Sequence, residues 1–157
     1  MGMNEFVAKK LGEVLAFSNI GMELFERSDS TLREAFSDVD EIKQTFQEQA
    51  SNIKQFTDTS GVWETTEAKA EATGDKLRGM METYIGDEWD NLAELLEWLG
   101  FMEGAAVVHW RVIEGAGETQ NDELLQQFAA DGAEFRHDLL HRVQEETKKV
   151  GAKRARG

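Results

Sequence analysis

Residues 99–110 read LGFMEGAAVVHW, an apolar stretch that carries a single carboxylate, Glu103, near its middle. Apolar residues on both sides of Glu103 recur at steps of three and four, which is the period of one helix face. They are Leu92, Leu96, Leu99, Ala106, Trp110 and Ile113. The spacing predicts a long helix over residues 87–115. Because an ionised carboxylate is costly to bury alone, Glu103 on this stripe needs a partner.

Four more segments have helical features. The same apolar periodicity predicts helices over residues 4–27, 31–56 and 122–149. A less apolar segment, residues 62–85, is rich in helix-forming residues but is interrupted by Gly74 and Gly79. No segment shows the period-two alternation or the Val/Ile/Thr-rich composition of a strand, so the sequence predicts an all-α fold.

The lengths of the connections predict the topology. A few residues join the first two long helices, and a few join the last two, whereas about thirty residues separate these pairs. Short links join helices that are antiparallel neighbours, and a long link can run the length of a bundle. We therefore expect a four-helix bundle with a long, partly helical crossover between its second and third helices.

Composition narrows the class of protein. The chain has 157 residues, and we expect one domain over residues 1–150 followed by a basic tail over 151–157. It has no Cys, which excludes disulfides and thiolate metal sites, and its net charge of −14 argues against nucleic acid as a partner. No apolar run is long enough for a membrane span, and the N-terminus lacks the apolar core of a signal peptide, so we expect a cytoplasmic protein.

Carboxylates and histidines occur in helical register. Glu13 lies on or beside the apolar stripe of the first predicted helix, as Glu103 does in the third. In the last helix, Glu134 and His137 have the Glu-x-x-His spacing that di-iron carboxylate bundles use. Carboxylate and imidazole groups are ligands for iron and manganese. A shared cation would also relieve the repulsion between carboxylates that face each other in a bundle core.

The second predicted helix contains no His. If Phe46 is aligned with Phe135 on the hydrophobic register, Glu48 lies opposite His137 and is the candidate ligand in place of the missing His. We expect His141 to be an outer neighbour of the metal ligands or a solvent-exposed residue, and His109 to be a surface or interface residue.

The chain resembles the ferritin-like superfamily, which includes ferritins, rubrerythrins and related di-iron bundles. The resemblance covers most of the chain in helix lengths and crossover. In its motifs it covers Glu13, Glu103, Glu134 and His137, with Glu48 as the fifth candidate. It implies one or two iron or manganese ions in the bundle core, with iron oxidation or oxygen and peroxide chemistry. The chain departs from the family pattern because it has only one of the two Glu-x-x-His pairs.

Two other interpretations predict different surroundings for Glu103. In a metal-free ferritin-like bundle that acts as a dimeric structural or protein-interaction module, Glu103 would be buried and paired with Arg, Asn or water. In an ordinary bundle it would face the edge and meet water, Arg111 or Arg136. We also expect a homodimer, because Trp89 and Trp98 at flanking positions suggest helix packing between copies; the alternative is that these two residues cover the crossover.

Overall fold

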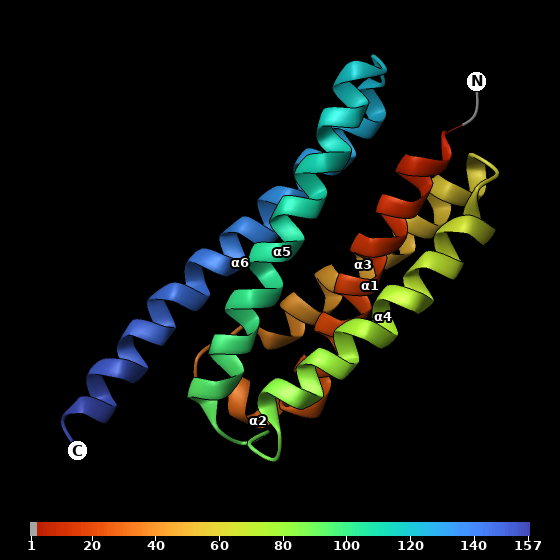
Figure 1. Cartoon of the computed structure of the whole chain (residues 1–157). Coiled ribbons are helices and arrows are strands. Elements are labelled where there is room, and N and C mark those ends of the chain that lie inside the picture. The colour runs from red at the N-terminus through yellow and green to blue at the C-terminus, as the bar shows by residue number, and fades with distance from the viewer. Residues whose placement is uncertain (1–2) are drawn as a thin grey trace.

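Helices make up most of the computed structural model, which describes residues 3–157 (Figure 1). These residues contain five long helices, one short helix and no strand, so the predicted all-α class is confirmed. The helices are α1 (Glu5–Arg27), α2 (Asp29–Leu32), α3 (Val39–Thr59), α4 (Trp63–Ile85), α5 (Leu92–Thr119) and α6 (Glu123–Ala155).

Polar side chains fix where three of the long helices begin. The side-chain oxygens of Asn4, Asn91 and Asp122 accept hydrogen bonds from backbone N–H groups in the first turns of α1, α5 and α6. Asn and Asp are favoured at this position because they satisfy donors that the helix itself cannot. α5 therefore begins at Leu92, five residues after the predicted start.

The predicted helix over residues 31–56 is wrong at its beginning. The chain forms the short helix α2, then a turn, and α3 starts only at Val39. Leu32 and Phe36 are buried in the core on either side of the break. Asp38 accepts two hydrogen bonds from Arg142 of α6, one of them 2.9 Å long. Tertiary contacts thus hold this turn, although the apolar spacing alone would continue the helix.

The helix predicted over residues 62–85 is confirmed as α4, and it packs along α1. Gly12 of α1 makes this close approach possible, because a Cβ atom there would lie 2.5 Å from the carbonyl oxygen of Thr66. The Thr66 hydroxyl donates a 2.8 Å hydrogen bond to the carbonyl oxygen of Ala8. The predicted crossover between the second and third bundle helices is therefore itself a helix, α4, which packs on α1.

Both C-terminal helices end later than predicted. α5 continues through Gly115 to Thr119, and the missing side chain of Gly117 gives Gln126 of α6 room to approach. α6 continues to Ala155 rather than ending at 149. Most of the expected basic tail is thus helical and exposed.

Successive long helices run in opposite directions (Figure 1). α5 packs mainly on α6, and α1 packs mainly on α4, while α4 and α5 have little direct contact. Two apolar clusters fill the interior, one around Phe25, Phe46 and Leu96 and the other around Leu11, Trp110 and Leu125. In the described part of the chain, no helix is long and apolar enough to cross a membrane.

Candidate functional site

Glu103 is buried, and its partner is Arg136. Both side chains are fully inaccessible to solvent. The Arg136 Nη1 atom donates to both carboxylate oxygens of Glu103, at 2.9 Å and 2.6 Å. The prediction that Glu103 lies on the core stripe of its helix is confirmed. Its partner is the guanidinium of Arg136, as in the interpretation that pairs a buried Glu103 with Arg, Asn or water.

The pair belongs to a polar layer that joins four helices. Arg136 Nη2 donates to the Ser18 hydroxyl on α1 at 3.3 Å, and that hydroxyl donates to Gln49 Oε1 on α3 at 3.1 Å. The ring of Phe46 lies 4.5 Å from the guanidinium carbon, close enough for a cation–π contact. α1, α3, α5 and α6 each contribute a polar side chain to this layer.

The electrostatics of the layer follow from burial. Burial raises the pKa of Glu103 above its ordinary value, because a carboxylate loses its hydration there, and the Arg136 guanidinium acts in the opposite direction. A buried ion pair is retained when geometry and hydrogen bonds compensate for the lost water. The positive charge that Glu103 needs is therefore supplied by the protein itself.

The importance of Arg136 was missed from the sequence, although a signal was present. Arg136 lies on the buried stripe of α6, at helical spacing from Ala129, Ala133, Leu139 and Val143. A charged residue on such a stripe needs a buried partner, just as Glu103 does on α5. The Glu-x-x-His spacing directed attention instead to Glu134 and His137, on a different face of the same helix.

Three basic side chains lie around Glu13. Its carboxylate lies 3.1 Å from Lys10 Nζ, 3.1 Å from His109 Nε2 and 3.8 Å from Lys69 Nζ. The other ring nitrogen of His109 lies 2.7 Å from the carbonyl oxygen of Ala105. Glu13 is thus held at the contact of α1 with α4 and α5, and His109 is partly buried there.

The other candidate ligands lie outside the core. Glu48 is exposed on α3 and accepts a 3.1 Å hydrogen bond from Gln44, and Glu134 and His137 are exposed on α6, as is His141. The structure does not bring the five predicted ligands together. Across residues 3–157, no three acidic or histidine side chains are grouped so that they could hold a metal ion.

Phe46 and Phe135, on which the alignment of the second and last predicted helices was based, are in contact, but Glu48 and His137 are both exposed. The rings of Phe46 and Phe135 pack edge to face, with centroids 5.5 Å apart. This contact turns Glu48, Glu134 and His137 outward, because on these helices the apolar side chains and Arg136 occupy the inner positions.

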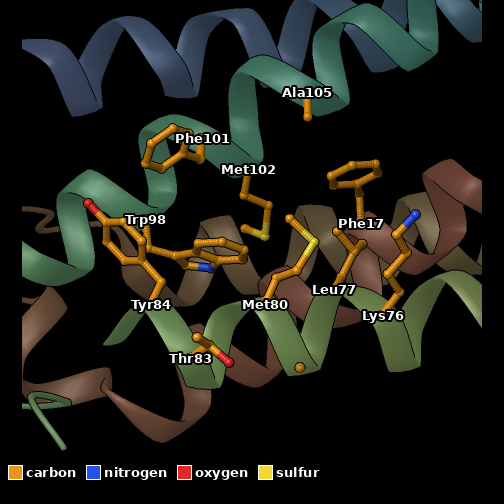
Figure 2. A pocket seen from close by; sticks show the side chains of 11 residues that line it. Phe17, Lys76, Leu77, Met80, Thr83, Tyr84, Trp98, Phe101, Met102 and Ala105 are labelled. Carbon is orange, nitrogen blue, oxygen red and sulfur yellow. The ribbon is translucent and has the colours of Figure 1, made fainter. Parts of the chain in front are cut away.

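An open apolar groove lies on the other side of α5, between α5 and α4 (Figure 2). It has a volume of about 780 Å³. Apolar side chains dominate its walls, and Phe17 of α1 forms part of its floor. The main wall residues are Leu77, Met80 and Tyr84 from α4 and Trp98, Phe101 and Met102 from α5.

Large apolar side chains at the groove are exposed to solvent. Met80 is 50 % exposed and Phe101 is 63 % exposed. Polar groups lie at the two ends, with Lys76 at one and the Tyr84 hydroxyl at the other (Figure 2). Burial and the neighbouring Glu97 raise the pKa of Tyr84 above its ordinary value. The Tyr84 hydroxyl donates to Glu97 at 3.2 Å.

Comparison with known proteins adds no relative to this description. The chain matches no protein-family model, no curated protein and no solved structure. Functional inference therefore depends on the two features that flank α5. One is a buried ion pair whose two charges are matched within the protein, and the other is an open apolar groove that can bind an apolar surface.

Proposed function

We propose that the chain is a metal-free bundle of ferritin-like connectivity that acts as a protein-interaction module. In this proposal α1, α3, α5 and α6 are the bundle helices, and α4 is a helical crossover packed on the outside of α1. The interaction surface is the groove between α4 and α5, which accepts the apolar face of a partner helix.

The Glu103–Arg136 pair supports the metal-free part of the proposal. A divalent cation at Glu103 would have to displace the guanidinium, which would leave the charge of Arg136 buried without a partner. Breaking a buried pair in this way is strongly unfavourable. An iron or manganese centre at Glu13, Glu48, Glu103, Glu134 and His137 is the competing proposal, and it also requires the exposed ligands to turn inward.

The groove is the observation that carries the interaction function. Folded monomers rarely leave several large apolar side chains exposed side by side, because each loses stabilisation by staying in water. At this groove Met80, Tyr84 and Phe101 all keep more than a third of their surface exposed. A partner helix that covered them would recover that stabilisation, as in other helix-in-groove complexes.

The binding of Nile red, a neutral apolar dye, tests the groove without interference from the net charge of −14. We expect dye fluorescence with the dilute wild-type chain and a large loss of it in Met80→Asp and Phe101→Asp. Leu124→Asp is the matched control, because Leu124 is 77 % exposed on α6, away from the groove. Equal loss in the control, or no loss in the groove variants, would contradict the proposal.

The metal content of the purified protein tests the metal-free part of the proposal. The protein would be purified without chelator, soaked anaerobically in ferrous iron or manganous ion, desalted and analysed by mass spectrometry. We expect no more bound metal than in the Glu103→Gln variant. One or two ions per wild-type chain, lost in that variant, would replace the metal-free proposal with the metal centre.

A further inference from the structure

The apolar surface of the groove continues along the outer face of α5. Phe101, Ala105, Val108 and Val112 follow one another at steps of four, three and four residues. Phe101, Val108 and Val112 are 63 %, 61 % and 37 % exposed. This spacing is typical of the seam along which two helices pack in a coiled coil. These four residues are called the α5 seam below.

The α5 seam and the rim of α4 form one surface. The rings of Tyr84 and Phe101 pack edge to face, with centroids 5.4 Å apart. Ala105 lines the groove as well as the seam (Figure 2). A helix that packs along the seam therefore has an adjoining hollow between α4 and α5 for its larger side chains.

Three residues flanking the seam have a symmetric pattern. Glu97 lies seven residues before Gly104, and Arg111 lies seven residues after it. Seven residues are about two helical turns, so the three share one edge of the helix. If two α5 helices packed antiparallel about a twofold axis at Gly104, Glu97 of each copy would approach Arg111 of the other.

Gly104 suits such an axis. Among the described residues, a Cβ atom at Gly104 would meet nothing within 4 Å, as at Gly100 and Gly115 of the same helix, so no contact between them requires a glycine there. Glycine inside a helix is destabilising, and its use is clearest where another backbone approaches closely. Arg111 now pairs only with Glu114 on its own helix, at 2.8 Å, and half of its side chain is exposed.

We propose that the occupant of the groove is a second copy of this chain, bound through antiparallel pairing of the α5 seams about a twofold axis at Gly104. The edge of the seam has Glu97 towards one end and Arg111 towards the other, a charge pattern that complements itself when two copies pair antiparallel. Repulsion between two chains of charge −14 is spread over their surfaces and screened by salt beyond a Debye length of about 8 Å.

Light scattering and sedimentation equilibrium at physiological salt measure the dimer directly. We expect a species of twice 17.7 kDa for the wild type. Val108→Glu places a charge in the seam and raises the dimer dissociation constant by more than about a hundredfold. Because Val108 is exposed, this variant keeps the helical circular dichroism of the wild type.

Charge reversal tests the antiparallel register. Glu97→Arg and Arg111→Glu each place like charges opposite one another in the homodimer, and each weakens it by about tenfold. A mixture of the two variants restores both opposite-charge pairs, so heterodimers form with close to wild-type affinity. Glu134→Arg and Arg156→Glu are controls that change the net charge equally at exposed positions away from α5.

This inference rests on the proposed interaction function, but an experiment can contradict the second copy as occupant without contradicting the interaction function. A wild-type monomer at all accessible concentrations, or a dimer unaffected by Val108→Glu, would overturn the second copy as occupant. If Nile red still bound the groove, the interaction function would stand with another partner. Loss of groove-dependent dye binding would remove both proposals. Failure of the mixed variants to associate would overturn the antiparallel pairing.

Discussion

α5 has two contrasting sides. Towards α6 it is closely packed, and even its charged residue Glu103 is fully buried against Arg136. Towards α4 it has little direct contact and leaves an apolar groove of about 780 Å³. The polar group is thus hidden inside the protein, while apolar groups such as Phe101 face water, which reverses the usual arrangement.

The two sides of α5 have different roles: the side that faces α6 stabilises the fold, and the side that faces α4 is available for binding. Within the chain, Arg136 donates hydrogen bonds to both carboxylate oxygens of Glu103, so the two buried charges are matched, although Arg136 Nε has no hydrogen-bond partner among the described residues. The exposed part of the seam is left in water by the described residues and gains further stabilisation when another apolar surface covers it. We therefore expect substitutions on the closed side to change stability and those on the open side to change association.

The largest effect is expected at the buried pair. Arg136→Ala leaves Glu103 buried without its counter-charge and should lower the free energy of unfolding by about 3–5 kcal/mol. Replacing both residues with Leu should cost far less, or stabilise the protein, because neither charge is then buried. Urea denaturation measures both. Lys149→Ala, which removes an exposed pair with Glu146, is the control and should cost less than about 1 kcal/mol.

Two phenylalanines, one buried and one exposed, should differ in their effect on stability. Phe46 is fully buried against Phe25, Phe135 and Arg136, so Phe46→Ala should destabilise the protein by about 3–5 kcal/mol. Phe101→Ala should change the stability of the monomer by less than about 0.5 kcal/mol, because Phe101 is 63 % exposed. Thermal unfolding of dilute protein compares them, and a large loss in Phe101→Ala would mean that the groove is part of the core.

Two glycine substitutions, one at a packed position and one at an open position, should have smaller effects on stability. Gly12→Ala places a Cβ atom against the backbone of α4 and should destabilise the protein by about 1–3 kcal/mol. Gly104→Ala meets nothing and should stabilise the monomer by about 0.4–1 kcal/mol, while weakening the proposed dimer. If both substitutions destabilised the dilute chain equally, α5 would not be open at Gly104.

The smallest expected effect is a pH dependence of stability that arises at Asp29, the first residue of α2. Arg33 and Lys43 hold the pKa of Asp29 at about 2, below its ordinary value of 3.8. Because the folded-state pKa is the lower one, this carboxylate stabilises the fold fully above about pH 4 and loses that contribution as the pH falls towards 2. Thermal unfolding of Asp29→Asn should therefore differ from wild type at neutral pH and converge with it in acid.

The helices could be predicted from the sequence because their apolar stripes are long and regular. The errors arose where a tertiary contact decides the boundary. Asp38 ends a turn because Arg142, far away in the sequence, binds it. Gly117 lies inside α5 because α6 passes close to it. Helical periodicity reports on one segment at a time, so neither contact was visible in it.

The site was predictable only in part. Glu103 was recognised because it interrupts an apolar stripe, and Arg136 interrupts the stripe of α6 in the same way. Exposure of Glu134 and His137 could not be read from their spacing, because a Glu-x-x-His pair can lie on any face of a helix. The open groove did have a signal in Phe101 and Val108, since they lie on the face of α5 opposite its core stripe.

A single cysteine at Gly104 tests the proposed interface most directly, because the chain has no other Cys. A disulfide requires Cα atoms within about 7 Å, which the twofold axis would provide and random collision would not maintain. Under mild oxidation of Gly104→Cys we expect most of the protein to run as a covalent dimer on a non-reducing gel. The control Glu118→Cys, exposed on the same helix, should remain a monomer. Equal cross-linking of the two variants, or none in either, would contradict pairing of the open face of α5 with a second copy.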